Sequence, residues 1–384
     1  MSENKRIECV DITKGLAIIV VVVSHLVSSA GVSDVITRVF GGLMGVFFML
    51  SSYFYKPGKG YLYNVKRRFF QVVVPFLVYM FVVLILCYIY ELIRGTGTAF
   101  TEYLKAYWQR IYDSSSLTEI NLGPNTAGGM PRAAGVRTAS IIRTALVPSW
   151  FLHRMFFSEL IFFAVADWAL ANAKRAAGTI FALLSITVLY VQFVPVHMPL
   201  QLDSCFAIAG IMLFGSYMRK LDAATYIETH PWDRNKIIIT GVFLVLYVLS
   251  AIFLSDFFGR MLINGKFGTV GSLSVYIWFF CQVIFFYVML LLGSLLKHIG
   301  FLASGLKLVG KHTLIILLFH MFFGKVTGQL LTSAFGYESQ PIWISIVSVV
   351  LALVLSLLVS FARDAVKARI AARRQTKAEQ AKGV

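Results

Sequence analysis

The chain has 384 residues, of which 58% are hydrophobic and 14% are charged. Because charged residues make up about 25% of an ordinary soluble domain, this composition excludes a soluble globular enzyme and indicates a polytopic membrane protein. The formal net charge of +17 comes without any zinc-finger or recognition-helix pattern, so we attribute it to basic loops beside anionic lipid and expect no nucleic-acid partner.

Apolar stretches long enough to cross a bilayer recur along the chain. About ten are candidates, near residues 13–31, 37–55, 69–93, 147–170, 177–195, 200–218, 236–255, 269–294, 312–330 and 341–362. Lipid offers the backbone no hydrogen-bond partner, so such segments are helical. We therefore predict an all-α integral membrane protein, a bundle of about ten transmembrane helices in which residues 1–362 form the membrane domain.

Basic residues gather on one side of this arrangement. They occur at Lys5 and Arg6, in the KPGKG and VKRRFF segments, at Lys174, Arg175, Arg219, Lys220, Lys297, Lys307 and Lys311, and in the tail KARIAARRQTK. Lys and Arg favour the cytoplasmic side, so we expect both termini in the cytoplasm and a multi-pass protein of the cell membrane, with the bacterial plasma membrane as the expected location. Residues 363–384 are then a basic cytoplasmic tail, either a helix or a disordered arm, that contacts the bilayer surface.

One long segment, residues 94–146, is not a span and is expected on the outer side. Its first part places aromatic and aliphatic residues at helical spacing, namely Phe100, Tyr103, Leu104, Tyr107, Trp108 and Ile111. Such a helix can stack against sugars or anchor the chain at the membrane interface, and the sequence leaves both open.

Cysteine usage argues against disulfides and metal centres. Cys87, Cys205 and Cys281 lie in apolar spans and Cys9 lies in the cytoplasmic head. No His, Cys or carboxylate set has the spacing of a metal site, so we expect no metal.

Two ionisable residues, Lys14 and His25, lie at the ends of the first apolar run, KGLAIIVVVVSHL. Eleven residues at about 100° each bring both to one face of a helix, about 16 Å apart. Each alone has an ordinary explanation, since a lysine can anchor a span and a histidine can cap it. The pair indicates a ligand that enters beside Lys14 and reacts near His25, because ionisable groups inside a membrane are costly.

Six segments follow one another as motifs. They are RIECVDITKGLAIIVVVVSHL, FFMLSSYFY, VKRRFFQVVVPF, SWFLHRMFFSELIFF, MPLQLDSCFAIAGIMLFGSYMRK and GKHTLIILLFHMFF. In this order they resemble the signature of the membrane-bound acyltransferase 3 family, and the last two resemble its branch of sugar O-acetylases, which includes fucose 4-O-acetylase-like proteins. Ser52 stands where the family has glycine, and Gln71 stands where a second arginine is common.

The resemblance implies transfer of an acyl group, usually acetyl from acetyl-CoA, to a hydroxyl of a cell-envelope polysaccharide or lipid-linked sugar. The alternative is a secondary transporter that exports a glycan or its precursor, because buried His, Asp and Glu residues also suit proton coupling. Against transport, the two halves of the chain show no visible repeat.

The donor residues are expected at the cytoplasmic helix ends. There Lys14, Arg67 and Arg68 can pair with the phosphates of acyl-CoA, and the resemblance adds Ser51 of the FFMLSSYFY motif. Plain topology signalling is the competing explanation for Arg67 and Arg68.

His25 is the expected general base, because a sugar hydroxyl needs its proton withdrawn and imidazole titrates near neutral pH. A covalent acyl-histidine is the second option. Asp203 is expected at the depth of His25, where it can orient the imidazole or hold the acceptor. Trp150 can stack on a sugar ring or belong to the aromatic belt.

Two further ionisable residues, Glu159 and His320, are nearer the middle of the membrane. We assign Glu159 to catalysis and His320 to substrate binding, with a bundle-stabilising pair as the alternative. Asp167 is expected to form an interfacial pair with Lys174 and Arg175.

Overall fold

The computed structural model describes residues 7–27, 35–36, 39–95, 99–101, 103–104, 107–108, 145, 149–194, 199–254 and 273–382. Within these residues the chain forms helices and turns and no strand. The predicted outer segment 94–146 falls largely outside them.

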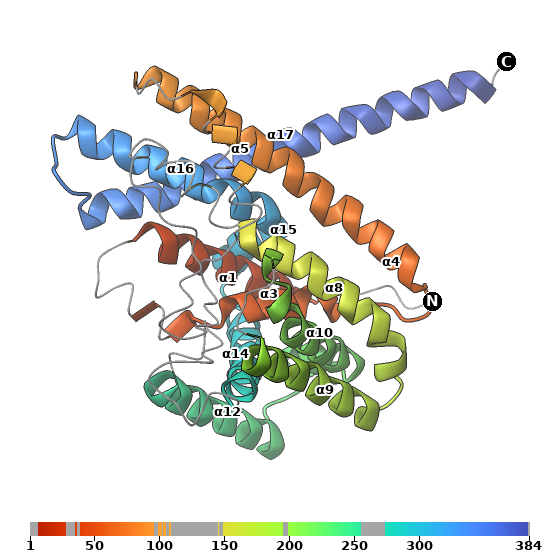
Figure 1. Cartoon of the computed structure of the whole chain (residues 1–384). Coiled ribbons are helices and arrows are strands. Elements are labelled where there is room, and N and C mark those ends of the chain that lie inside the picture. The colour runs from red at the N-terminus through yellow and green to blue at the C-terminus, as the bar shows by residue number, and fades with distance from the viewer. Residues whose placement is uncertain are drawn as a thin grey trace.

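The first group of helices runs to the middle of the chain (Figure 1). It comprises α1 (Glu8–Leu26), α3 (Leu43–Tyr53), α4 (Tyr61–Arg68), the π-helix η1 (Phe69–Val73), α5 (Val74–Ile93), α8 (Ser149–Ala169) and α9 (Ala173–Phe193). The second group comprises the 3-10 helix η2 (Pro199–Ser204), α10 (Cys205–Lys220), α11 (Ala223–Thr229), α12 (Arg234–Phe253), α14 (Ser274–Leu296), α15 (Gly300–Lys311), α16 (Thr313–Ala334) and α17 (Ile342–Lys382).

Seven of the described helices are long and apolar enough to cross a membrane. They are Glu8–Leu26, Tyr61–Ile93, Ala173–Tyr190, Arg234–Phe253, Ser274–Leu296, Thr313–Ala334 and Ile342–Arg373. The other three predicted stretches coincide with α3, α8 and the η2–α10 unit. α3 has 11 residues, so at about 1.5 Å each it is shorter than a hydrocarbon core of about 30 Å. The chain is thus a membrane protein of packed helices, as predicted.

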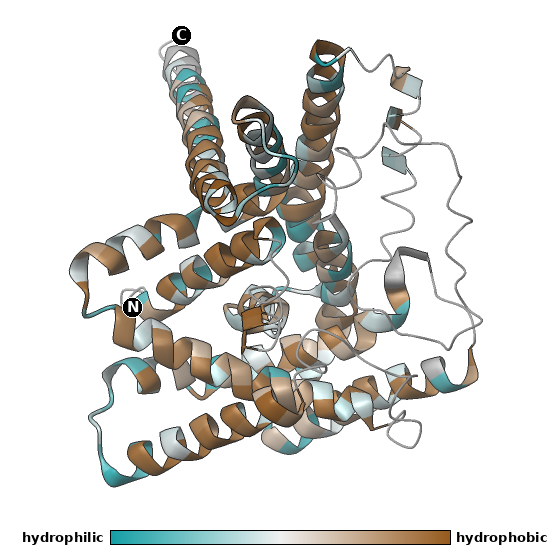
Figure 2. Cartoon of the chain, turned by 90° about the vertical axis from the view of Figure 1, so that its left-hand side faces the viewer, coloured by the Kyte–Doolittle hydropathy of each residue, from teal (hydrophilic) through white to brown (hydrophobic). Residues whose placement is uncertain are grey.

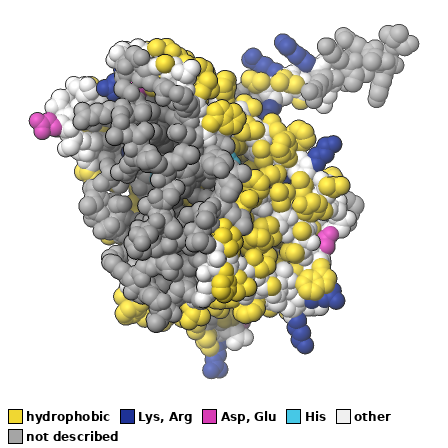
Figure 3. Space-filling model, in the orientation of Figure 1, with side chains coloured by type: hydrophobic (Ala, Val, Ile, Leu, Met, Phe, Trp, Pro, Cys, Tyr) yellow, Lys and Arg dark blue, Asp and Glu magenta, His cyan; other side chains and the backbone are white. Residues whose placement is uncertain are grey.

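Burial separates central from peripheral helices. In the most apolar stretch of α1 and of α14, 61% of residues are buried, against 17% in α12. Apolar side chains of α12 therefore face outward, where lipid would surround them. Figure 2 shows the helices mostly apolar along their length, with polar residues at ends and turns. Figure 3 shows apolar side chains gathered on one face, with Lys and Arg near its margins.

The last helix continues through the predicted tail. α17 has 41 residues, about 62 Å at 1.5 Å per residue, or about twice the thickness of a hydrocarbon core. Its C-terminal end projects away from the other helices (Figure 1). Residues 363–382 therefore extend the final span as the same helix.

α1 is held in the centre by close helix packing. It packs against α14, α15, α16 and α17. Its crossing with α15 uses a glycine on each helix, because a Cβ at Gly15 would collide with the Leu306 carbonyl and a Cβ at Gly310 with the Asp11 carbonyl. Small residues permit such backbone approach between membrane helices. This contact fixes the part of α1 that carries Lys14.

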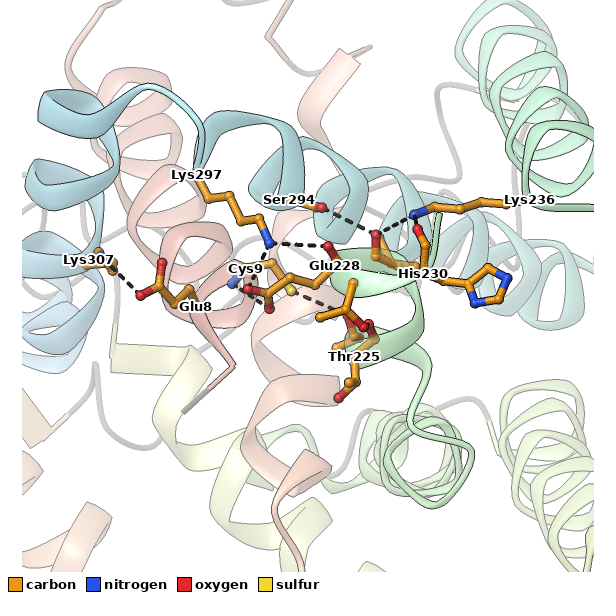
Figure 4. Close-up of polar contacts among 12 residues, drawn as sticks. Glu8, Cys9, Thr225, Glu228, His230, Lys236, Ser294, Lys297 and Lys307 are labelled. Carbon is orange, nitrogen blue, oxygen red and sulfur yellow. Dashed lines mark hydrogen bonds and ion pairs between the residues drawn. The ribbon is translucent and has the colours of Figure 1, made fainter. Parts of the chain in front are cut away.

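A polar network fixes the first turn of α1 (Figure 4). The Cys9 amide donates to Glu228 Oε2 at 3.4 Å, and the Lys297 ammonium pairs with Glu228 Oε1 at 3.2 Å. The buried Lys236 ammonium donates to the carbonyls of Ile227 and His230 at the end of α11. Since a helix leaves its last carbonyls unpaired, these donors stabilise α11 and join it to α1, α12 and α14.

Several of the basic residues predicted to share one side lie at one end of the bundle. Arg219 and Lys14 both approach the Phe54 ring, at 5.8 Å and 5.5 Å. Lys220, next to Arg219, donates to the Leu170 carbonyl at 2.8 Å. We call this the basic end, and the end where α1 terminates and α8 and α10 begin the opposite end.

Candidate functional site

A cavity of about 410 Å³ lies at the basic end. Its walls come from α1, α3, the α3–α4 connection, the α4–η1 helix, α8 and α16. The lining residues include Lys14, Ile18, Ser51, Ser52, Lys56, Lys59, Asn64, Arg67, Arg68, Gln71, Val72, Met155, Glu159, Phe162, Thr313 and Leu317. The structure thus brings together five residues predicted for the site, which are Lys14, Ser51, Arg67, Arg68 and Glu159.

Five of the lining residues are cations, Lys14, Lys56, Lys59, Arg67 and Arg68. Lys56 and Lys59 belong to the KPGKG turn between α3 and α4. From the sequence, these lysines indicate only which side of the membrane the turn lies on. This turn bends sharply because Gly58 and Gly60 adopt φ of 84° and 75°, a region that side chains disfavour. Cations concentrated in one recess attract a multiply charged anion such as a phosphate.

Arg68 is fixed between two other predicted residues. Its Nη2 donates to the Ser51 carbonyl at 2.6 Å and lies 2.6 Å from Glu159 Oε1. The Glu159 side chain is 1% exposed and that of Arg68 is 24% exposed. A buried carboxylate needs a cationic partner, so Glu159 holds Arg68 at the cavity wall. The sequence places Glu159 only by its depth in the membrane, and depth does not reveal this partner.

The cavity wall beside Arg68 is a π-helical turn. η1 follows α4 without a break and carries Gln71 and Val72 on the cavity side. Pro75 follows it, and because proline has no N–H it cannot donate to the carbonyl four residues earlier. The wider turn accommodates this missing bond, as π-bulges do at many functional sites. The helix therefore changes its winding where it faces the cavity.

Ser52, which stands where the motif has glycine, makes hydrogen bonds that a glycine side chain could not make. Its hydroxyl donates to the Met212 carbonyl at 2.6 Å, and Ser216 donates to the Ser52 carbonyl at 2.6 Å. These bonds join α3 to α10 beside the cavity.

Beyond the inner end of the cavity, two histidines lie side by side. The rings of His25 and His320 are 5.5 Å apart between centroids and tilted by 30°. Leu317 lines the cavity one turn before His320, and Ile18 lines it two turns before His25. The imidazole pair thus lies further along the same two helices, α1 and α16, that form part of the cavity wall. The sequence singled out both residues without indicating that they meet.

The hydrogen bonds of His320 determine its tautomer. Its Nδ1 lies 2.9 Å from the carbonyls of both Ile316 and Leu317. A carbonyl only accepts, so Nδ1 carries the proton and Nε2 carries a lone pair. That Nε2 is buried and has no hydrogen-bond partner among the described residues. It can therefore accept a proton beside His25.

Asp203 and Trp150 lie at the opposite end. Asp203 is 1% exposed and accepts from the Ser204 amide at 3.0 Å. Trp150 is 5% exposed, and the guanidinium of Arg154 lies 4.9 Å from its ring. Asp203 is close enough to Arg154 for electrostatic interaction. His25 therefore lies next to the ring of His320, whereas Asp203 interacts with Arg154. The sequence analysis does not single out Arg154, although an arginine within an apolar helix indicates a functional site.

The prediction that Asp167 pairs with Lys174 and Arg175 is wrong. Asp167 Oδ1 accepts from the Tyr55 hydroxyl at 2.8 Å and from the Gly58 amide at 3.3 Å. Arg175 instead lies over the Trp168 ring at 5.4 Å. The KPGKG turn folds back over the end of α8, and the Asp167 carboxylate holds it there through these two hydrogen bonds.

No three His, Cys, Asp or Glu side chains gather as a metal site requires within the described part of the chain. The chemistry available is a recess that combines cations with apolar walls, and a pair of imidazoles further along two of the helices that line it.

Comparison with known proteins gives one match. The family model described as an acyltransferase domain, Acyl_transf_3, matches residues 7–362. No curated protein and no solved structure matched the chain. The matched residues include the cavity, the imidazole pair and the Arg154 cluster. The chain therefore belongs to the acyltransferase 3 family.

Proposed function

We propose that this protein is a membrane O-acyltransferase that moves an acetyl group from cytoplasmic acetyl-CoA to a hydroxyl of a cell-envelope glycan or lipid-linked sugar. The observation that carries the proposal is one cavity that combines five cations with apolar wall residues on α1 and α16, the two helices that carry His25 and His320 further along. Phosphates need the cations, a thioester arm fits against apolar walls, and acyl transfer needs a base at its end.

The cations would hold the donor. Acyl-CoA carries several phosphate charges and cannot cross the membrane, so its nucleotide must stay at the basic end, which we assign to the cytoplasm. Lys56 and Lys59 on the turn, with Arg67 behind them, would pair with these phosphates. Arg68, held by Glu159 at 2.6 Å, is a rigid donor contact. Lys14 stands where the arm would enter between α1 and α16.

The imidazole pair would supply the proton transfer. The acceptor hydroxyl attacks the thioester carbonyl, the O–H proton passes to His25, a C–O bond forms, and the C–S bond breaks. The CoA thiolate then takes up the proton that His25 carries. His320, with its Nε2 lone pair beside His25, would position the base and stabilise its protonated form. An acyl-histidine intermediate on His25 is the covalent alternative.

Radiolabelled acetyl-CoA and cell-envelope glycan, incubated with the purified protein, test the proposal. Label should appear on the glycan and free CoA should appear in equal amount. Movement of glycan or its precursor across a vesicle membrane without label would instead support the transporter reading.

Neutralising the cations of the cavity is expected to weaken donor binding selectively. Lys14→Ala, Lys59→Ala and Arg67→Ala should each raise the apparent KM for acetyl-CoA about 10-fold to 100-fold, since a charge-assisted contact contributes about 1.5–3 kcal/mol. Lys14→Arg should be tolerated better than Lys14→Ala. Steady-state kinetics in both substrates measure this.

The control for this set is Lys66→Ala, because Lys66 is exposed on α4 and does not line the cavity. It should leave both KM values unchanged. Equal increases in the KM for donor and acceptor in the cavity variants would contradict a donor role and indicate a folding defect.

Donor and acceptor are expected on opposite sides of the membrane. Cysteines at Ser114 and Tyr337 should react with a membrane-impermeant thiol reagent from outside, and one at Lys377 should not. The native cysteines, Cys9, Cys87, Cys205 and Cys281, are all buried and should give little background. The inverted labelling pattern would exclude a route in which the acyl group passes through the bundle from inside to outside.

A further inference from the structure

A fully buried arginine, Arg154, lies in α8 outside the cavity of the basic end. Its side chain is 1% exposed. Its Nε and Nη1 have no hydrogen-bond partner among the described residues. A guanidinium has five donors and cannot lose its charge, so unpaired buried N–H groups on it are costly. Such a group calls for an acceptor, and the described residues supply none to these two nitrogens.

The surroundings of Arg154 resemble a binding site more than a structural ion pair. Trp150 lies one turn earlier on α8, with the guanidinium 4.9 Å from its ring. Asp203 approaches from η2 and interacts electrostatically with the arginine. Ser158, one turn later on the same face of α8, is also fully buried. A donor, an acceptor and an aromatic ring thus converge on one face of α8.

This cluster lies where an acceptor would have to arrive. Arg154 is five residues from the start of α8, about 7.5 Å along the axis. His25 is in the last turn of α1, which runs in the opposite direction, so both lie towards the opposite end of the bundle. Glu159, further along α8, lines the cation-rich cavity. α8 therefore carries the Arg154 cluster near its start and, about one and a half turns later, the glutamate that holds Arg68 at the cavity wall.

Charge decides which ligand fits. The arginine and the aspartate nearly cancel, so a carboxylate or phosphate would gain from Arg154 but be repelled by Asp203. A hydroxyl can accept from the guanidinium and donate to the carboxylate, and a sugar ring can pack against the indole. Neighbouring hydroxyls of a neutral sugar fit all three groups.

We propose that Arg154, with Asp203 and Trp150, forms an acceptor subsite that binds vicinal hydroxyls of a neutral sugar. The assignment rests on the proposed acyltransferase function and adds the sugar class and the residue that recognises it. In this scheme Arg154 contacts the acceptor sugar, and acetyl-CoA does not contact Arg154.

Direct binding tests the subsite without any transfer reaction. A panel of radiolabelled neutral methyl hexosides and methyl 6-deoxyhexosides, with methyl glucuronide as the charged counterpart, is equilibrated with the purified wild type, Arg154→Lys and Arg154→Gln. The wild type should retain at least one neutral glycoside more tightly than the glucuronide. Both variants should weaken that binding about 10-fold or more, because lysine keeps the charge but loses the planar fork of donors. Binding of acetyl-CoA should stay within about twofold of the wild type, since Arg154 is outside the donor cavity.

The matched control is Arg175→Gln, which removes a guanidinium lying 5.4 Å from the Trp168 ring at the basic end. It should leave glycoside binding unchanged. Equal loss of glycoside and acetyl-CoA binding in the Arg154 variants would show a structural role and overturn the subsite. Unchanged glycoside binding in those variants, or failure of the wild type to retain any neutral glycoside, would overturn it as well. If glycosides bind as expected but no acetyl group is transferred, the subsite stands and the proposed function fails.

Discussion

His25→Ala is expected to lower the rate of acyl transfer about 10²–10⁴-fold, the contribution typical of a general base. The protein should remain inserted and folded, because His25 lies in the last turn of α1 and is partly exposed, away from the Gly15 and Gly310 contact that holds this helix. The KM for acetyl-CoA should change little, since the cations that bind the donor are unaffected. Initial rates with saturating substrates, together with thermal unfolding in detergent, measure the two properties separately.

The control is His298→Ala, which removes an exposed histidine between α14 and α15 and should keep full activity. His320→Asn is a companion variant, because the asparagine amide can still donate towards the Ile316 and Leu317 carbonyls while the Nε2 lone pair is lost. It should slow transfer without loosening α16. Retention of most activity in His25→Ala would remove this residue from the mechanism. A stable acyl-enzyme trapped with donor alone would favour the covalent route.

The helical architecture could be predicted from the sequence because lipid leaves the backbone only one common solution. Each predicted apolar stretch coincides with a helix, and their depths placed Lys14, Arg67 and Arg68 at one level. Cations at the same helix ends share a depth, and here they also share a cavity. This part of the site followed from composition and spacing.

The lateral arrangement could not be predicted in the same way. Depth brought Asp203 and His25 to one level, but it carries no information about which helices are neighbours. The contact between His25 and His320 joins the first helix to α16, about 300 residues away, and depends on how α1 packs in the centre. The partners of Glu159 and Asp167 came from α4 and the KPGKG turn for the same reason.

The remaining gaps have local causes. Arg154 does not stand out in the sequence, because it lies in an apolar stretch that serves there only to predict a membrane span. The lysines of the KPGKG turn were read only as a topology signal, because their place beside the cavity depends on Gly58 and Gly60 bending the turn. For the tail, the sequence left a helix and a disordered arm open, and α17 continues through residues 363–382 as the helix, in keeping with the high helix propensity of its Ala, Arg, Lys and Gln residues.

The second large effect is expected at the ion pair between Arg68 and Glu159. Arg68→Ala leaves a fully buried carboxylate without its cation, which should destabilise the folded protein by about 3–5 kcal/mol. It also removes a donor contact, so the KM for acetyl-CoA should rise. Arg67→Ala is the neighbouring control, because Arg67 lines the cavity but holds no buried carboxylate, and it should raise the same KM with little loss of stability.

A double variant separates the two roles of Arg68. In Arg68→Ala with Glu159→Gln, the neutral amide no longer needs a cation, so most of the stability should return while donor binding stays weak. Thermal unfolding and steady-state kinetics on the same preparations give both quantities. If the double variant is as unstable as Arg68→Ala alone, the ion pair is not what Arg68 contributes to folding. If donor binding recovers with stability, Arg68 does not contact the donor.

Glu159→Gln alone then decides between positioning and catalysis. If Glu159 only holds Arg68, the amide should leave Arg68 less well fixed, and the KM for acetyl-CoA should rise about 3–10-fold with kcat nearly unchanged. If Glu159 moves a proton in the reaction, kcat itself should fall about 10²-fold or more, because an amide cannot replace a carboxylate in proton transfer. The distance of 2.6 Å between Arg68 and Glu159, at the cavity wall rather than beside His25, favours the first outcome.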